Sequence, residues 1–275
     1  MNRNEVDPDV SPGMAYGARL RRSREERGWT QEELGARMGY SGTHISAVEN
    51  GRRPPTPHFS AMADKVLGTG GEFEREGRSL RTPAVLEGFP EYVAQEMQAA
   101  EVRVFELGII PGVLQTPEYA AAIAAGAVDR GTITEEQAQS RLSLVARRQD
   151  ALNRSPAPSI FVVLDESCIR RPVGGPSLMR AQLGRLIEFA GQANTVLQVA
   201  PYELGARRAF DLPLYILTMR DRSHMSYAES AQRGHLERET ASVVPLLTAY
   251  HHLAAESLSQ AASVAMIQEA RKGMS

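Results

Sequence analysis

The chain has 275 residues, of which 42% are hydrophobic, and a formal net charge of −2 at pH 7. This length fits two modest domains with ordinary cores. The sequence contains no run of about eighteen apolar residues, so no membrane span is expected. The single cysteine, Cys168, excludes an internal disulfide, and the first residues lack the apolar stretch of a secretory signal. We therefore expect a cytoplasmic protein without membrane contact, and the weak net charge argues against a general polyanion binder.

Charge is distributed unevenly along the chain. Residues 12–71 contain nine Lys or Arg and six Asp or Glu, a net charge of +3, so the rest of the chain carries −5. A modestly basic head on an acidic body is typical of a protein that touches phosphate at one end only.

The first third of the sequence is predicted to be all-α. Residues 1–13 are expected to form a disordered arm, and residues 14–81 a five-helix domain in which Gly and Pro separate short helical patterns. The expected helices are residues 16–28, 30–38, 42–50 and 56–68, followed by the charged stretch 71–88, whose helix runs into a linker.

Residues 82–275 are predicted to form an α+β domain with a small sheet, packing helices and a long C-terminal helix. Apolar β-rich runs occupy residues 159–166, 195–202, 212–219 and 224–230. A helical pattern between the first two runs suggests a parallel crossover, and the short gap between the last two suggests a hairpin. The helical patterns are residues 115–126, 132–154, 176–192 and 243–273.

Two of these helical patterns carry specific signals. Thr134 and Gln137 are spaced as a capping box at the start of the second pattern. In the last pattern, apolar residues recur on or near one side, which predicts one continuous helix. These residues are Leu247, Tyr250, Leu253, Leu258 and Ile267.

The stretch "WTQEELGARMGYSGTHISAVENGRRPP" carries the most specific signals in the head. Thr30 and Glu33 are spaced as a capping box, and Trp29 and Leu34 occupy the staple positions around it. Gly39 can adopt the left-handed conformation that ends this helix. Two helices joined by a short turn that contains Gly form the helix-turn-helix arrangement.

The second helix of this pair, capped by Ser41, is predicted to present a slim outer face. Ile45 and Val48 face inward, which leaves short side chains outside. Such a helix can enter a major groove roughly 12 Å wide and bring its side chains to base edges. The outer residues are Gly42, Thr43, His44, Ser46 and Ala47.

Phosphate-binding groups are expected on either side of that helix. Gln31 lies at a helix N-terminus, where its amide can meet a phosphate oxygen, and Arg52 and Arg53 leave the second helix before two prolines. A protein-binding helical bundle is the alternative, but the caps, turn and basic exit together favour DNA. The predicted DNA-binding residues are Gln31, Ser41, Thr43, His44, Ser46, Ala47, Asn50, Arg52 and Arg53.

Residues 17–67 resemble the xenobiotic-response-element family of phage-repressor-type helix-turn-helix domains, through the motifs "WTQEELGARMG" and "ISAVENGRRPPT". The resemblance implies a five-helix domain, Gln31 on phosphate and base contacts from the outer helix. It also implies an ion pair between Arg24 and Glu49. Because Gly42 and Ala47 stand where the family often has Gln or Asn, readout of DNA shape or through water gains weight.

Residues from about 90 to 270 are similar to the C-terminal domain of actinobacterial regulators of the WhiJ type. The matching stretches include "ELGIIPGVLQTPEYA" and "LDESCIRRPVGGPSLMRAQLGRLIEFA". This resemblance implies a developmental or antibiotic-production regulator, whose gene often neighbours one for a small partner protein.

Other residues of the second domain leave their roles open. Asp165 and Glu166 could be an acid–base pair or simply the solvated end of a strand, and the chain carries no recognisable catalytic, cofactor or metal motif. The stretch around Ile110, Val113, Leu114 and Tyr119 could line a pocket or a partner surface, or it could be ordinary core. The loop with Arg207, Arg208 and Phe210 could capture an acidic partner or a ligand carboxylate, or it could be solvated.

Three functional hypotheses follow. The first is a sequence-specific transcriptional regulator that is nucleoid-associated when bound to a double-stranded operator, and whose residues 82–275 dimerise and receive a signal from a small molecule or small partner protein. The second is the DNA-binding member of an antitoxin-like protein pair. The third, an enzyme fused to a DNA-binding head, has the weakest support because no catalytic constellation is present, and a non-enzymatic protein is expected.

Overall fold

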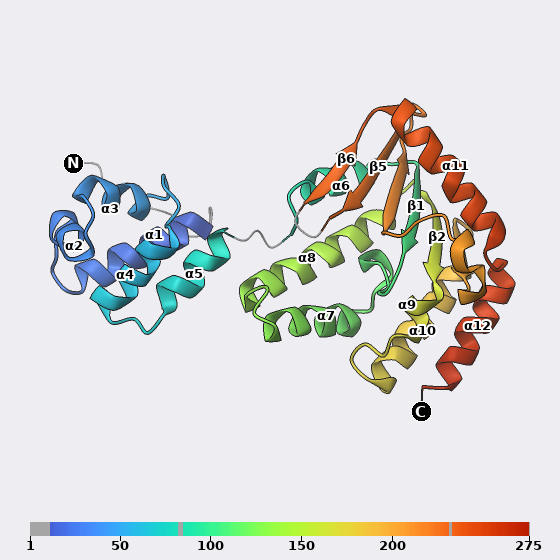
Figure 1. Ribbon diagram of the computed structural model, residues 1–275, viewed down its shortest axis with the longest axis horizontal. Coiled ribbons are helices and arrows are strands. Elements are labelled where there is room, and N and C mark those ends of the chain that lie inside the picture. Colours follow the sequence, from blue (N-terminus) through green and yellow to red (C-terminus); the bar gives the residue numbers. More distant parts are fainter. Residues whose placement is uncertain (1–11, 82–84, 231–232, 275) are drawn as a thin grey trace. The chain divides into compact units, whose positions relative to one another are not determined.

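The computed structural model describes residues 12–81, 85–230 and 233–274. The chain divides into two compact units, residues 1–84 and 85–275 (Figure 1), and each unit has a hydrophobic interior of its own. Residues 1–11 of the predicted disordered arm lie outside the described residues, whereas Pro12 and Gly13 already belong to the first helix. None of the described helices is long and apolar enough to span a membrane.

The N-terminal unit is helical throughout its described elements. The helices are α1 Pro12–Glu25, α2 Gln31–Met38, α3 Gly42–Glu49, α4 Pro57–Leu67 and α5 Glu72–Arg81. Apolar residues one helical turn apart meet in a single core that contains Tyr16, Leu20, Leu34, Met38, Ile45, Val48, Phe59, Ala63, Leu67 and Phe73.

Local polar contacts fix where these helices begin and end. Thr56 accepts a hydrogen bond from the Phe59 amide and caps α4, and Gly68 ends that helix in the left-handed conformation. The Asp64 carboxylate then accepts from the backbone amides of Phe73 and Glu74, at 3.0 and 2.8 Å, at the start of α5. These contacts tie the last two helices of the unit to each other.

The C-terminal unit is a mixed α/β structure. Its helices are α6 Phe89–Glu96, α7 Pro117–Asp129, α8 Glu135–Leu152, α9 Glu166–Arg170, α10 Pro176–Ala190, α11 Thr240–Glu256 and α12 Gln260–Lys272, with 3-10 turns η1 Gly112–Leu114 and η2 Tyr202–Arg207. Its strands are β1 Glu101–Glu106, β2 Ser159–Asp165, β3 Thr195–Ala200, β4 Leu214–Thr218, β5 His224–Glu229 and β6 Gly234–Glu237.

The strands form one six-stranded sheet in the order β3-β2-β1-β4-β5-β6. β1, β2 and β3 are parallel, and β4, β5 and β6 continue the sheet antiparallel. The predicted crossover between β2 and β3 and the hairpin between β4 and β5 are therefore confirmed. The sheet is larger than the predicted small sheet. The sequence signals did not predict β1, whose stretch mixes helix and strand signals, or β6, which has only four residues.

Side chains alternate between two cores on opposite faces of the sheet. On β2, Ile160, Val162 and Leu164 enter the core that includes residues of α6, α10 and α12, whereas Phe161 and Val163 contact the core that includes residues of α11. Figure 1 shows helices on both sides of the sheet. The two-faced burial explains why β2 and β4 are apolar at nearly every position.

The predicted single C-terminal helix is wrong, since the structure has α11 and α12. Ser257 is extended, Ser259 caps α12, and the Leu258 amide between them donates to the carbonyl of Val199 on β3, at 3.0 Å. The chain therefore crosses the edge of the sheet at this break. Tyr250 lies in the core on one face and Ile267 in the core on the other, although the apolar periodicity continues across the break.

Side chains of α12 also cover the outer edge of β3. The Leu197 amide donates to Gln260 Oε1 at 3.1 Å, and the Val199 amide donates to Ser263 Oγ at 2.9 Å. Together with the Leu258 bond, these contacts occupy backbone groups that another strand would otherwise use.

Candidate nucleic-acid interface

The start of α2 is specified as the sequence predicts. The Thr30 amide donates to Glu33 Oε2 at 2.7 Å, and the Glu33 amide donates back to Thr30 Oγ1 at 3.1 Å. These hydrogen bonds lower the pKa of the Glu33 carboxyl. Gly39 ends the helix with φ of 78°, so α2 has a defined length and a sharp exit.

The turn between α2 and α3 needs a glycine on the preceding helix as well. A Cβ on Gly35 would lie 2.5 Å from the Tyr40 carbonyl oxygen, so only glycine lets the turn pack this closely. Ser41 Oγ then accepts from the His44 amide at 3.2 Å and caps α3. The helix-turn-helix geometry follows from these caps and this close approach.

The glutamate at the end of α3 anchors that helix to the rest of the unit. Glu49 is fully buried and accepts from Arg24 at 2.6 and 3.1 Å and from the side-chain Nε2 of Gln31 at 2.8 Å, while Arg21 Nε lies 3.5 Å away. Arg24 also donates to the Trp29 carbonyl at 2.7 Å. The pair implied by the resemblance is thus the centre of a network that joins α1, α2 and α3.

Close backbone packing supports the same helix. A Cβ on Gly17 of α1 would lie 2.5 Å from the Glu49 carbonyl oxygen and 2.6 Å from that of Val48. Only a glycine at this position allows α1 to lie against the end of α3. The position of α3 is therefore set by packing as well as by charge.

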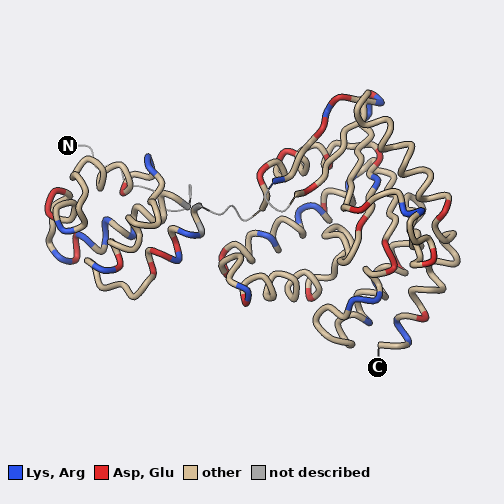
Figure 2. The backbone as a smooth tube through the Cα atoms, viewed as in Figure 1, with Lys and Arg blue, Asp and Glu red and all other residues tan. Residues whose placement is uncertain are grey.

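The residues predicted to contact DNA take different positions on and around α3. Thr43 is exposed, Ser46 and Ala47 are half-buried, and Arg52 and Arg53 are exposed in the following loop. Figure 2 shows basic residues in that loop. Thr43 on α3 therefore remains accessible, as a base-reading residue must be. Arg52 and Arg53 after α3 are also accessible, as phosphate contacts require.

His44 faces the interior instead. Its ring stacks on Phe59 at 5.4 Å between centroids and packs against Tyr40 at 4.6 Å, and its buried Nε2 atom has no hydrogen-bond partner among the described residues. Burial and the nearby Arg53 lower the pKa of the imidazole. The His44 ring therefore packs the start of α3 against Phe59 of α4.

Several predicted residues hold one another. The side-chain Nδ2 of Asn50 donates to the Ser46 carbonyl at 2.7 Å, and its Oδ1 accepts from Arg21 at 2.8 Å. Sequence reasoning missed Arg21, although it lies one helical turn before Arg24 on the same face of α1. Gln31, at the first position of α2, is half-buried and donates one side-chain amide hydrogen to Glu49.

Most of the candidate ligand residues of the C-terminal unit are buried in its core or paired with other residues of the same unit. Ile110, Val113, Leu114 and Tyr119 are buried in the main core, which is the ordinary-core alternative that the sequence left open. Their side chains pack within that core.

The loop arginines of that unit likewise contact acidic groups of the same unit. Arg207 lies 2.5 Å from Glu256, and Arg208 lies 2.8 Å from Asp165, while Phe210 packs against Phe105 with 5.7 Å between ring centroids. Arg208 and two hydrogen bonds from Ser167 lower the pKa of the Asp165 carboxyl despite its burial.

The neighbouring acidic and thiol groups are also held in place. Glu166 is bound by Arg170 at 3.0 Å and by the Tyr202 amide at 3.0 Å. Burial raises the pKa of the Cys168 thiol, which keeps it protonated at neutral pH. Among the residues that the structure describes, no cluster of three or more His, Cys, Asp or Glu could hold a metal ion.

Comparison with known proteins agrees with this division of the chain. Residues 15–76 match the model of a helix-turn-helix domain, and residues 89–269 match the model of a domain of unknown function, DUF5753. Over 40 residues, 14% of this chain and 52% of the relative, the sequence is 50% identical to an uncharacterized HTH-type transcriptional regulator, y4dJ, of Sinorhizobium fredii (strain NBRC 101917 / NGR234).

The match thus spans about half the length of that curated relative. No solved structure matches the chain. The DUF5753 model alone covers well over half of the sequence. The chain therefore belongs to the family of proteins that carry the DUF5753 domain, and its N-terminal unit is a DNA-binding helix-turn-helix domain of the transcription-regulator type.

Proposed function

We propose that the protein is a sequence-specific transcriptional regulator that reads its operator with α3. The observation that carries this proposal is that α3 is held in place while its outer face stays slim and accessible. Glu49 anchors its C-terminal end, and Thr43, with a short polar side chain, is exposed near its start. A helix held this firmly can place its side chains against base edges in a major groove.

Arg52 and Arg53 supply the phosphate contacts in this proposal. Both are exposed in the loop that follows α3, where guanidinium groups can meet the DNA backbone on either side of the groove. Ser46 and Ala47 complete the reading face, and His44 acts mainly by supporting the helix. Few direct base contacts then remain, so DNA shape and bound water contribute to specificity.

The protein is further proposed to bind as a dimer to a near-palindromic operator. One small head buries too little surface for tight specific binding, and two half-sites about 34 Å apart are the usual solution. In this proposal the C-terminal unit supplies dimerisation and receives a signal from a small molecule or a small partner protein.

The proposal is tested by selecting duplexes from a randomised pool with the full chain. We expect the pool to converge on a near-palindromic site. Thr43→Ala should then weaken binding to that site and spare binding to unrelated duplexes. Failure of the pool to converge would contradict sequence specificity, and equal losses on both kinds of duplex would remove Thr43 from the reading face.

A further inference from the structure

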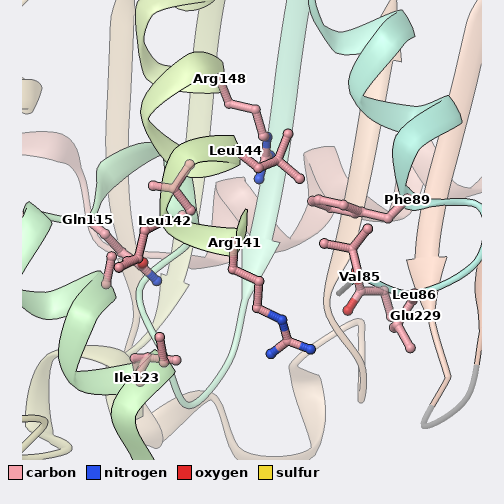
Figure 3. Close-up of a pocket in the computed structure, with 14 residues that line it drawn as sticks. Val85, Leu86, Phe89, Gln115, Ile123, Arg141, Leu142, Leu144, Arg148 and Glu229 are labelled. Atoms are coloured by element: carbon pink, nitrogen blue, oxygen red, sulfur yellow. The ribbon is translucent and has the colours of Figure 1, made fainter. Parts of the chain in front are cut away.

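A cavity of about 410 Å³ lies within the C-terminal unit. Val85, Leu86 and Phe89 form one side of it, and Ile123 of α7 with Leu142 and Leu144 of α8 form the other, as Figure 3 shows. The size falls in the range of pockets that hold small organic molecules, roughly 300–1,000 Å³, and a mostly apolar lining is typical of them.

The inner end of the cavity is rigid. Arg148 is buried there and donates to both oxygens of Glu96, at 2.7 and 2.8 Å, while Glu96 also accepts from the Tyr92 hydroxyl at 2.6 Å. The guanidinium lies 5.1 Å from the centroid of the Phe89 ring, which is itself part of the lining. These contacts give the cavity a fixed polar floor.

The charged groups at the cavity balance each other. Arg148 is neutralised by Glu96, and Arg141, which extends into the space in Figure 3, interacts electrostatically with Glu229. Burial lowers the pKa of Arg141, and the Glu229 carboxylate opposes that shift. A ligand with a net charge would meet no compensating surplus of the opposite sign, so the lining favours an uncharged molecule.

The Gln115 side chain can orient such a molecule. The Gln115 amide nitrogen donates to the Ile110 carbonyl at 2.7 Å, so its oxygen is the acceptor that this side chain offers to the cavity. An apolar body with a hydroxyl group that donates to this oxygen matches the lining.

The wall formed by Val85 and Leu86 is also the segment that enters the C-terminal unit from the DNA-binding unit. Val85 stands only four positions after Arg81, the last residue of α5. The segment is held by a backbone hydrogen bond of 2.8 Å from the Gly234 amide to the Glu87 carbonyl and by an exposed ion pair between Glu87 and Arg233 at 3.1 Å. Gly88 is left-handed, with φ of 88°, and any side chain there would overlap the Gly234 carbonyl.

We propose that this cavity binds an uncharged, largely apolar small molecule and that its occupancy fixes residues 85–89, thereby changing the DNA affinity of the helix-turn-helix unit. A ligand between the two walls buries Val85 and Leu86 against α7 and α8 and so adds apolar contacts to a segment with few polar anchors. Because it binds better when the segment is in place, it shifts the segment toward that state. The effect on DNA rests on the proposed regulatory function, whereas ligand binding and ordering of the segment do not.

The probe for the first test is N-phenylnaphthylamine, an uncharged dye that fluoresces in apolar sites. The full chain should bind about one dye molecule, and Ile123→Trp, which fills the cavity, should weaken binding at least tenfold. The matched control is Ala125→Trp, on an exposed position of the same helix, and it should bind as the parent does. Unchanged affinity in Ile123→Trp would overturn the site.

A second variant guards against misfolding. If thermal unfolding shows that Ile123→Trp does not fold, Ile123→Gln keeps the side-chain size, introduces an unmatched amide and should also weaken binding severalfold. The sulfonated analogue anilinonaphthalene sulfonate tests the charge argument. It should bind at least tenfold more weakly than the uncharged dye, and the reverse order would overturn the ligand class.

Hydrogen–deuterium exchange tests the link to the segment. Saturating dye should slow exchange of the amides of residues 85–89 at least threefold in the parent chain and leave them unchanged in Ile123→Trp. Unchanged exchange in a dye-bound parent chain would overturn the coupling. The dye should also change affinity for the selected operator, and failure of the chain to bind any duplex would contradict only the proposed function, because the exchange result needs no DNA.

Discussion

A buried arginine–glutamate pair joins two helices in each unit, but the two pairs do different things. In the N-terminal unit, Glu49 is shared by Arg24 and Gln31 directly behind an exposed helix face. In the C-terminal unit, Arg148 and Glu96 are enclosed by aromatic rings at the floor of a cavity. The same interaction therefore fixes a convex reading surface in one unit and a concave binding surface in the other.

Removing one acid at a time separates the two pairs most strongly. Glu49→Ala and Glu96→Ala should each destabilise its own unit by about 3–5 kcal/mol, because each leaves a buried guanidinium without its partner. Trp29 is the single tryptophan of the chain, so its fluorescence follows the N-terminal unit alone, while far-UV circular dichroism follows both.

Denaturant unfolding should then show an early Trp29 transition in Glu49→Ala and a normal one in Glu96→Ala. Glu25→Ala is the control, because Glu25 is an exposed partner of Arg24 and its loss should change stability little. An equal shift of the Trp29 transition in both alanine variants would show that the units unfold as one.

The second largest effect is expected from Glu106 in the C-terminal unit. Burial raises the pKa of this carboxyl from 4.5 to about 7, although Tyr215 donates a hydrogen bond to it. Since the folded-state pKa lies above the unfolded one, the stabilising contribution is complete below pH 4.5 and is lost as pH rises through 7. The loss approaches about 3 kcal/mol at higher pH.

Denaturation followed by circular dichroism between pH 5 and 8.5 measures this dependence. Glu106→Gln should flatten it, and Glu101→Gln, at the other end of the same strand, should preserve it. A parent chain whose C-terminal unit is equally stable at both ends of this range would refute the assignment.

The N-terminal unit should differ in its response to salt. If Arg52 and Arg53 each contact one phosphate, their joint replacement by Gln should reduce the slope of log binding constant against log salt by about 1.8. Arg75→Gln, on an exposed position of α5, should leave the slope unchanged. Fluorescence anisotropy at several salt concentrations measures it, and an unaltered slope in the double variant would exclude both arginines from the clamp.

The smallest effect is expected from His44, and its sign is opposite to that of Glu106. The folded state lowers the pKa of His44 below 6.5, so its contribution to stability is complete above pH 6.5 and is lost as pH falls through the lowered pKa. The Trp29 transition should move to lower denaturant between pH 7 and 5, and less so in His44→Gln. An identical shift in both proteins would assign the effect to another group.

Local sequence signals predicted the parts of the fold that local contacts determine. The capping boxes at Thr30 and Thr134 are present as expected, because both partners lie within one helical turn. The inward position of His44 was missed, since it depends on Phe59 from another helix. Helical spacing alone places His44 beside Thr43 on the outer face.

Contacts between distant positions left no comparable signal. Arg148 and Glu96 are 52 positions apart, and nothing near either residue indicates that it will be buried. The apolar spacing across Leu258 continued as in one helix, although the backbone there bonds to β3. The cavity was missed for the same reason: sequence reasoning selected apolar residues around Ile110, and these became core beside it.

The covered edge of β3 has a consequence for how the chain behaves in a crowded solution. Exposed strand edges act as templates on which other chains add strands and aggregate. Here Leu258, Gln260 and Ser263 already satisfy the backbone of β3, so that edge offers no template. Loss of α12 would do more than open the core, because it would turn one side of the sheet into a surface for polymerisation.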